Sequence, residues 1–335
     1  MGTIYDVARL AGVSTATVSR YLNGSPRVRP ETAERIRQAI DQTGFVLNTA
    51  ARSLTTKRTG LIGFVTSDLM NPFTTELAHA MTLQAGEAGL SLLTAVTFGD
   101  QDTFLTTITE LRRHQVDGVI ATPPETPAIV EALRGLARGG VAVVTIGISV
   151  DDAPVDFASV DTYHGGRLAV EHLTGLGHRR IGLITGAPEG EVAGSRYRAY
   201  HDVLTEADIT IDPSLIVATT LDREGGSIAA ARLLDLEQPP TAIFAVNDVM
   251  ALGVIQQCHS RGIRVPQDLS VVGFDDIAMA SHSAPPLTTV AQPRSELGRA
   301  AATLMIERLA RPDTEPRQIR MDCSLVPRSS TAPLD

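Results

Sequence analysis

Residues Ile4 to Arg20 read IYDVARLAGVSTATVSR. The apolar residues up to Ala11 keep helical spacing, and Gly12 stops this first helix because glycine readily adopts the left-handed conformation that follows many helices. Ser14 comes next as the expected N-cap of a second helix over Thr15 to Leu22, which again has an apolar face. Two short helices joined by a tight turn predict a helix-turn-helix.

A third helix is expected from Glu31 to Thr43, opened by Pro30 and stopped by Gly44, so that three small helices share one core. The second helix of a helix-turn-helix enters the major groove with its first residues, where short polar or methyl-bearing side chains and arginine can read bases. The side chains at this position suit that role: Thr15, Ala16, Thr17, Ser19 and Arg20. Taken singly, each of them would be a helix cap or a solvated surface residue.

Charge is divided unevenly along the chain. Residues 1–60 contain nine basic and four acidic side chains, which leaves 20 basic and 34 acidic side chains in the remainder of the 335 residues. A basic segment attracts a polyanion such as nucleic acid, and an acidic remainder is repelled by it. Charge alone gives only a weak preference for DNA binding, because short segments also vary in charge by chance.

The stretch from Ile4 to Arg20 as a whole resembles the LacI/GalR family of bacterial transcription regulators. The resemblance implies that Thr15, Ala16 and Arg20 face the base edges of double-stranded operator DNA. It implies that a second set of side chains holds phosphates or the turn: Ser14, Thr17, Ser19 and Asn23. Thr3 and Tyr5 are assigned to the same DNA interface. Arg29 stands where the family usually has a capping serine, so the third helix is expected to lack that cap.

The segment from Asn48 to Leu54 looks like the hinge helix of the same family. A helix of roughly two turns is not stable alone, so we expect it to fold only with a partner. The resemblance implies that Asn48, Ala51 and Leu54 contact DNA, with Leu54 wedged between base pairs in the minor groove, where an apolar wedge kinks the duplex. Without the resemblance, Leu54 would equally be a linker leucine that rests on the core.

Short apolar runs alternate with amphipathic stretches from Leu61 onward, which is the rhythm of a parallel sheet with crossover helices. Strands are expected at 61–66, 90–96, 118–121, 141–146, 181–185, 242–246 and 269–274, and helices at 74–88, 164–176, 196–205, 225–236 and 249–261. An eight-fold barrel is the rival fold. The repeat of IGFVT at 62–66 as IGLIT at 181–185 favours two doubly wound lobes instead, of the kind found in periplasmic binding proteins.

The expected domain organisation is therefore an all-α helix-turn-helix domain over 1–47, a hinge helix and linker over 48–60, and an α/β core over 61–335. Within the core, the N-lobe is expected at about 61–160 and 292–320, and the C-lobe at about 161–291 and 321–335.

Polar and aromatic side chains follow several of the expected strands. Ligands of doubly wound sheets bind at the carboxyl ends of the strands, which predicts an effector site between the lobes. The candidate residues are Asp68, Asn71, Phe73, Asp161, Arg196, Asn247 and Asp275. The family resemblance implies that Arg196, Asn247 and Asp275 hold hydroxyl or carboxyl groups of the effector and that Phe73 forms a wall. An arginine fork and a carboxylate suit a sugar-like ligand.

Three further charged residues are ambiguous. Asp248 is expected to be a helix N-cap rather than a ligand contact, and Asp276 is expected to cap a helix or face solvent. Arg294 could select an anionic or carboxylated effector, and a surface role is equally credible.

These observations predict a repressor that is a homodimer, binds a near-palindromic operator and is controlled by a small-molecule effector, a sugar or related metabolite. An enzyme is disfavoured because the motifs GxSxG, GxxxxGK[ST], HExxH and GxGxxG after the first strand are missing. A solute-binding protein for transport would leave the basic head without a role. It would also need a secretory signal, which the first residues do not resemble, so we expect the cytoplasm.

No cofactor, metal site or membrane segment is expected. The two cysteines, Cys258 and Cys323, lack the spacing of metal ligands and are expected to be inert packing residues. No run of about 18 apolar residues occurs.

Overall fold

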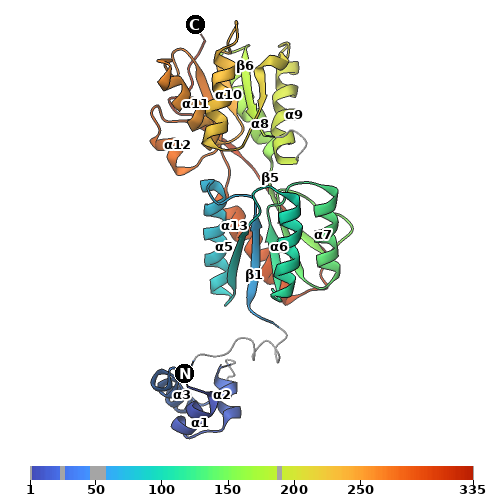
Figure 1. Ribbon diagram of the computed structural model, residues 1–335, viewed down its shortest axis with the longest axis vertical. Helices are drawn as coiled ribbons and strands as arrows, with labels where there is room; N and C mark the ends of the chain where they lie inside the picture. Colours follow the sequence, from blue (N-terminus) through green and yellow to red (C-terminus); the bar gives the residue numbers. More distant parts are fainter. Residues whose placement is uncertain (1, 23–26, 46–57, 187–190, 335) are drawn as a thin grey trace. The chain divides into compact units, whose positions relative to one another are not determined.

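The computed structural model describes residues 2–22, 27–45, 58–186 and 191–334, and for residues 191–193 it describes the backbone alone (Figure 1). The chain divides into two compact units, Met1–Thr59 and Gly60–Asp335, and each is described by itself.

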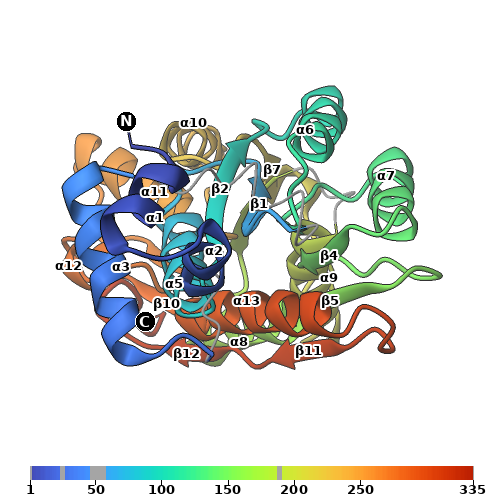
Figure 2. The same ribbon diagram turned by 90° about the horizontal axis from the view of Figure 1, so that it is seen from below.

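The described residues of the first unit form α1 (Ile4–Ala11), α2 (Thr15–Leu22) and α3 (Pro30–Thr43), as the sequence predicts (Figure 2). Val7, Val18 and Ile36, one from each helix, are fully buried in a common core. Gly12 has a φ of 63°, which is the left-handed conformation expected after α1. Arg29 makes no side-chain cap on α3, in keeping with the expected loss of that cap.

The second unit contains two six-stranded sheets, so the barrel alternative is wrong and the prediction of two α/β lobes is confirmed. In the N-lobe the strand order is β11-β5-β4-β3-β1-β2, and every pair is parallel. Its strands are β1 (Leu61–Thr66), β2 (Ser91–Val96), β3 (Gly118–Ala121), β4 (Ala142–Ile146), β5 (Val155–Val160) and β11 (Gln318–Met321).

In the C-lobe the strand order is β12-β10-β9-β8-β6-β7. Its strands are β6 (Ile181–Thr185), β7 (Ile216–Ala218), β8 (Ala242–Ala245), β9 (Ser270–Asp275), β10 (Thr288–Ala291) and β12 (Ser324–Val326). The repeated sequence motif lies on β1 and β6, which occupy equivalent positions in the two sheets. The strands that the sequence predicts are present to within one residue at each end.

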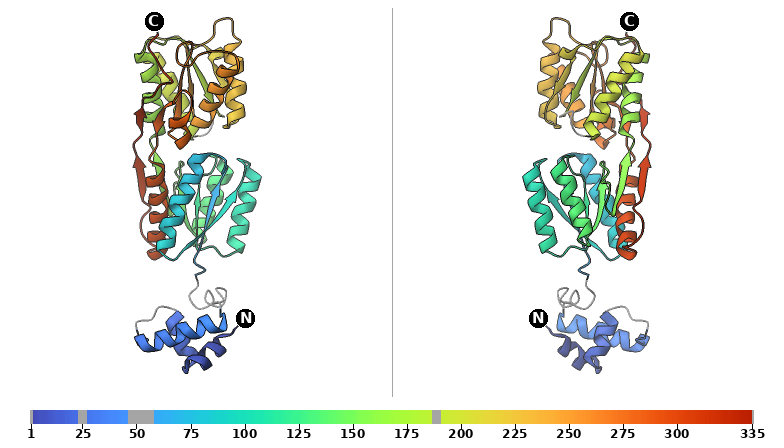
Figure 3. Two further views of the ribbon diagram at one scale, coloured as in Figure 1. Left: turned by 90° about the vertical axis from the view of Figure 1, so that its left-hand side faces the viewer. Right: turned by 90° about the vertical axis from the view of Figure 1, so that its right-hand side faces the viewer.

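Helices cover both faces of each sheet (Figure 3). The N-lobe carries α5 (Pro72–Glu87), α6 (Gln101–Arg113), α7 (Pro127–Arg138) and α13 (Arg294–Ala310). The C-lobe carries α8 (Thr162–Gly175), α9 (Glu191–Glu206), the 3-10 turn η1 (Pro213–Leu215), α10 (Arg223–Leu234), α11 (Asp248–Ser260) and α12 (Ala278–His282). Packed pairs of helices are α5 with α13, α8 with α9 and α10 with α11. Helix α9 starts earlier than the predicted Arg196.

The chain crosses between the lobes three times: after β5, after β10 and between β11 and β12. β12 runs antiparallel to β10, which differs from the expected all-parallel C-lobe sheet. The reason is geometric. β11 runs toward the C-lobe in parallel with β5, and the chain continues in the same direction into β12, whereas β10 runs toward the N-lobe.

A buried ion pair joins distant parts of the N-lobe. Asp156 on β5 is fully buried and lies 2.8 and 2.9 Å from Nε and Nη2 of Arg308 on α13. Arg308 also donates to the carbonyl oxygens of Pro312 and Glu315, and Asp156 accepts from the backbone N–H of Arg317. These bonds fix α13 and the segment leading to β11 against β5.

In the part of the chain that the structure describes, no helix has the length and apolar character needed to cross a membrane.

We expect Arg308→Met to lower the free energy of unfolding by about 3–5 kcal/mol, because the buried carboxylate of Asp156 loses the charged partner that donates two hydrogen bonds to it. The matched control is Arg299→Met on the same helix, where the arginine is exposed and pairs with Glu296; its expected change is within about 0.5 kcal/mol. Urea denaturation followed by circular dichroism measures both. Equal losses in the two variants would contradict the role given to Arg308.

Candidate functional site

Helix α2 presents the side chains assigned to base reading. Ala16 and Arg20 are exposed, Thr15 is partly exposed, and Val18 on the opposite side is buried. Ser14 accepts a hydrogen bond from the backbone N–H of Thr17 at 3.2 Å, which is the capping role expected from sequence. An exposed arginine behind short side chains at the start of a helix is what entry into a major groove requires.

The other residues assigned to the DNA interface have varied surroundings. Tyr5 is 74% exposed. Thr3 caps α1 in a reciprocal capping box with Asp6. The Oγ atom of Ser14 lies 2.9 Å from Oγ1 of Thr17, and Ser19 is partly exposed. Asn23, Asn48, Ala51 and Leu54 lie outside the described residues.

In the core, Arg196 on α9 is buried beside the aromatic ring of Phe274. Its guanidinium carbon lies 3.7 Å from the ring centroid, and Nη1 donates to the carbonyl oxygen of Val246. Burial lowers the pKa of Arg196, and the charge of Asp275 opposes this shift. Nε of Arg196 is buried and has no hydrogen-bond partner among the described residues. A buried donor without a partner is costly, which is explained if a ligand atom accepts its hydrogen bond.

Asp275 ends β9 with a φ of 116°, and its side chain is almost completely buried. Gln292 donates to its Oδ1 at 2.6 Å. Burial raises the pKa of Asp275 to about 6, and the charge of Arg196 is the strongest influence that opposes the rise. The hydrogen bond from Gln292, the charge of Arg294 and the side chain of Asn71 also lower this pKa. Asn71 belongs to the N-lobe, so the two lobes both contribute to the surroundings of this carboxylate.

The residues at the start of α11 correct one prediction. The N-cap of α11 is Asn247, whose Oδ1 accepts from the backbone N–H of Met250 at 2.7 Å, and not Asp248. Asp248 is fully buried and accepts hydrogen bonds from the backbone N–H of Ile277, at 2.8 Å, and from Thr289. Burial raises its pKa well above the usual value. Gly273 leaves room for this carboxylate, since a Cβ there would lie 2.2 Å from Oδ1 of Asp248.

The N-lobe candidates and Asp161, at the start of the C-lobe, mainly shape the backbone. Asp68 accepts from the N–H groups of Met70 and Asn71, and Asn71 caps α5 by accepting from Phe73 at 3.0 Å. Phe73 is partly buried against the core. Asp161 caps α8 by accepting from His164 at 2.9 Å. The structure thus brings Asn71, Arg196 and Asp275 together, whereas Asp68 and Phe73 have local contacts.

Two charged residues have partners that the sequence did not indicate. Arg294 is 15% exposed and pairs with Glu76 on α5, with Nε and Oε2 2.7 Å apart; it also donates to the carbonyl oxygens of Asp275 and Asp276. Its guanidinium is therefore neither a surface group nor an open anion receptor. Asp276 pairs with Arg328 at 2.6 Å rather than capping a helix or facing solvent. Gln292, Phe274 and Glu76 were also missed, because no local motif marks them.

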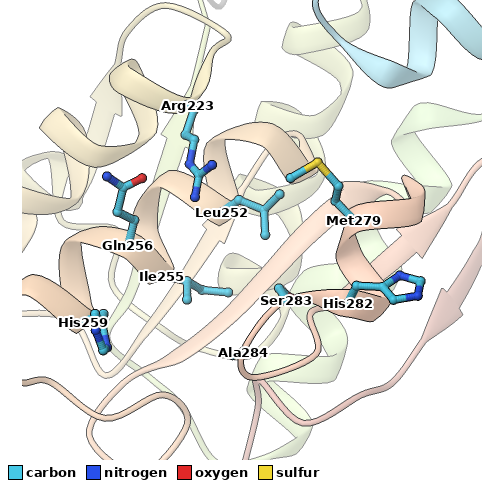
Figure 4. A pocket seen from close by; sticks show the side chains of 9 residues that line it. All are labelled: Arg223, Leu252, Ile255, Gln256, His259, Met279, His282, Ser283 and Ala284. Carbon is cyan, nitrogen blue, oxygen red and sulfur yellow. The ribbon is translucent and has the colours of Figure 1, made fainter.

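A concave feature lies on the surface of the C-lobe, over α10, α11 and α12 (Figure 4). It has a volume of about 410 Å³ and is mainly apolar. Its lining residues are Arg223, Leu252, Ile255, Gln256, His259, Met279, His282, Ser283 and Ala284. Among the described residues no cluster of three or more His, Cys, Asp or Glu side chains could hold a metal ion.

Both units match known protein families. Residues 3–48 match the model of the bacterial regulatory proteins of the lacI family, and residues 170–331 match that of a periplasmic binding protein-like domain. The HTH-type transcriptional regulator DegA of Bacillus subtilis (strain 168) is 39% identical over 99% of both chains.

Solved structures agree in fold. The Lac repressor dimer bound to operator and the anti-inducer ONPF is 29% identical over 98% of this chain and 99% of its own, with a TM-score of 0.86. The transcriptional regulator CelR in complex with cellobiose is 30% identical over 98% of this chain and 100% of its own, with a TM-score of 0.74. These relatives are transcriptional regulators rather than enzymes. With its helix-turn-helix unit and its two-lobed core, the chain belongs to the LacI family of bacterial regulatory proteins.

Proposed function

We propose that this protein is a dimeric repressor that binds a near-palindromic operator and whose affinity for DNA is controlled by a small molecule held between the lobes of its core. The observation that carries this proposal is α2, which buries Val18 and presents Thr15, Ala16 and Arg20 outward from a folded three-helix unit. In each copy, these three residues read bases in the major groove. Ser14, Thr17, Ser19 and Asn23 hold phosphates or the turn, and Thr3 and Tyr5 complete the interface.

The hinge residues Asn48, Ala51 and Leu54 extend this proposal to the minor groove. Leu54 of each copy wedges between base pairs at the centre of the operator, and this kink makes affinity depend on how easily the central sequence deforms.

The effector is an uncharged molecule rich in hydroxyl groups, as the relative CelR binds cellobiose. A hydroxyl oxygen can accept from the unpartnered Nε of Arg196 while its proton is donated to the carboxylate of Asp275. Arg294 already pairs with Glu76 and two carbonyl oxygens, so its charge is not available to a phosphate. An anionic group would instead meet the carboxylate of Asp275. Asn247 holds a further hydroxyl group of the effector, and Asn71 and Asp161 line the same site. Asp68 and Phe73 form the N-lobe side.

In the dimer, the second copy of the chain covers the apolar hollow on α10, α11 and α12. Met279 lines this hollow and is 50% exposed. A contiguous apolar patch that is exposed on a protein marks an interaction site. In a two-fold dimer the same patch meets itself, so a single surface is sufficient. The relative named as the Lac repressor is a dimer on its operator.

This role requires no catalysis, and we propose that the protein is not an enzyme. Because its target is operator DNA, it acts in the bacterial cytoplasm.

We expect Arg20→Ala to weaken operator binding by about 10- to 100-fold, because a bidentate contact between arginine and a base is lost. Arg37→Ala is the matched control in the same unit, since the Arg37 guanidinium is already held by Glu34 and Asp41. The operator is first selected from random duplexes with the full chain, and affinities are then measured by fluorescence anisotropy at one salt concentration. Unchanged affinity of Arg20→Ala would exclude α2 as the reading helix.

Effector binding is expected to weaken by about tenfold as the pH falls from 7 to 5, through the pKa of about 6 of Asp275, because a protonated carboxyl group accepts hydroxyl protons poorly. A thermal-shift screen of neutral sugars and their phosphates, followed by calorimetry at each pH, measures this. In Asp275→Asn, binding should be weak and independent of pH in this range. Tighter binding of a sugar phosphate than of the parent sugar would contradict the proposed effector class.

Met279→Glu is expected to shift the protein from dimer to monomer at micromolar concentration, because a charge is placed in the apolar interface. Operator affinity should fall with it by at least about tenfold, since each monomer holds one half-site. Leu334→Glu, at another exposed apolar residue of the C-lobe, is the control. Sedimentation velocity reports the assembly, and a fully dimeric Met279→Glu variant would rule out this face.

A further inference from the structure

The turn that carries Asp275 has an unusual backbone. Asp275 and Asp276 are consecutive residues other than glycine, and both have positive φ, 116° and 56°. Side chains disfavour this region, so the surrounding structure must hold the two residues in place. The direction of the Asp275 carboxylate depends on this turn, because the side chain of a residue follows its backbone.

Four side chains hold the turn. Arg294 donates from Nη1 to the carbonyl oxygens of both Asp275 and Asp276. Gln292 holds the carboxylate of Asp275, and Arg328 pairs with that of Asp276. After the turn, the backbone N–H of Ile277 donates to Asp248. Among the described residues, Arg294 is the only one whose side chain bonds to the backbone of Asp275 and Asp276 themselves.

Arg294, unlike the C-lobe side chains that hold the turn, is anchored on the N-lobe. It begins α13, which packs against α5 in the N-lobe, and its Nε pairs with Glu76 on α5. Ser295 also donates to Glu76, from Oγ to Oε1 at 3.0 Å. One guanidinium therefore bonds an N-lobe helix with one edge and the turn of the C-lobe with another. A planar fork with fixed donor directions can do this, whereas a lysine ammonium cannot present the same edges.

We propose that Arg294 is a positioning residue: it holds the Asp275 turn in its strained conformation and ties that turn to α5, so that effector binding at Asp275 depends on how the two lobes are set against each other. The effect on effector binding rests on the proposed function, since Asp275 is an effector ligand only under that function. That Arg294 holds the turn and that Glu76 anchors Arg294 follows from the hydrogen bonds alone.

The test compares amide hydrogen exchange in four full-length variants without DNA or effector: Arg294→Gln, Arg294→Lys, Glu76→Gln and the control Arg299→Gln, which removes an exposed arginine from the same helix. Exchange is followed in peptides covering 275–282, which include the turn, and 242–247, which report on the sheet. We expect Arg294→Gln to speed exchange in 275–282 by about tenfold, because two charge-assisted hydrogen bonds are lost. Exchange in 242–247 and in the control should not change.

The remaining variants separate positioning from a purely structural or electrostatic role. Arg294→Lys keeps the charge beside Glu76, so we expect a near-normal melting temperature but fast exchange of the turn. Glu76→Gln should also speed exchange in 275–282, by a smaller factor, because Arg294 loses its anchor.

Any one of four outcomes would overturn the proposal. Two concern Arg294→Gln: exchange in 275–282 stays at the normal rate, or exchange in 242–247 is accelerated equally. The other two are a normal rate of exchange in 275–282 in Arg294→Lys and an unchanged rate in Glu76→Gln. Because exchange needs neither operator nor effector, these outcomes are independent of whether the protein proves to be a repressor.

Discussion

The three passages of the chain between its two sheets constrain everything else in the core. Strands β5 and β10 each end where the chain leaves one lobe for the other, so the carboxyl ends of parallel strands are brought to the boundary of the lobes. Residues that follow those strands then gather there without being close in sequence. Arg196, Asp275 and Asn71 meet for this reason, although they come from three separate segments and from both lobes.

The sequence predicted the fold well because its signals are local. The helix-turn-helix depends on spacing and caps within about twenty residues, and the buried strands of both lobes are continuous apolar runs. β5 was missed because it contains Asp156, a charged residue whose burial depends on partners far along the chain, above all Arg308, 152 residues away. β7, β11 and β12 were missed because short mixed strands at the edge of a sheet carry little pattern of their own. β10 lies inside its sheet, and it was missed because it is only four residues long and begins with two threonines.

For the site, the sequence identified side chains but not their partners. Arg196 and Asp275 were named on the family resemblance, and their burial agrees with a ligand role. Asp248 was taken for a cap because the cap and the first helical residue differ by a single position and both are acidic or amide side chains. The contacts of Arg294 with Glu76, 218 residues away, follow only from the packing of α13 on α5, which no local motif could indicate.

The placement of β11 and β12 has a consequence for biosynthesis. Each of these late strands lies at the outer edge of a sheet whose first strands are translated much earlier, and the segment that leads into β11 closes on Asp156 across 161 residues. During translation the three-helix unit can fold as soon as it leaves the ribosome, while the core stays incomplete until its last strands emerge. A nascent polypeptide would thus carry a finished nucleic-acid-binding module before it possesses any means of responding to a metabolite.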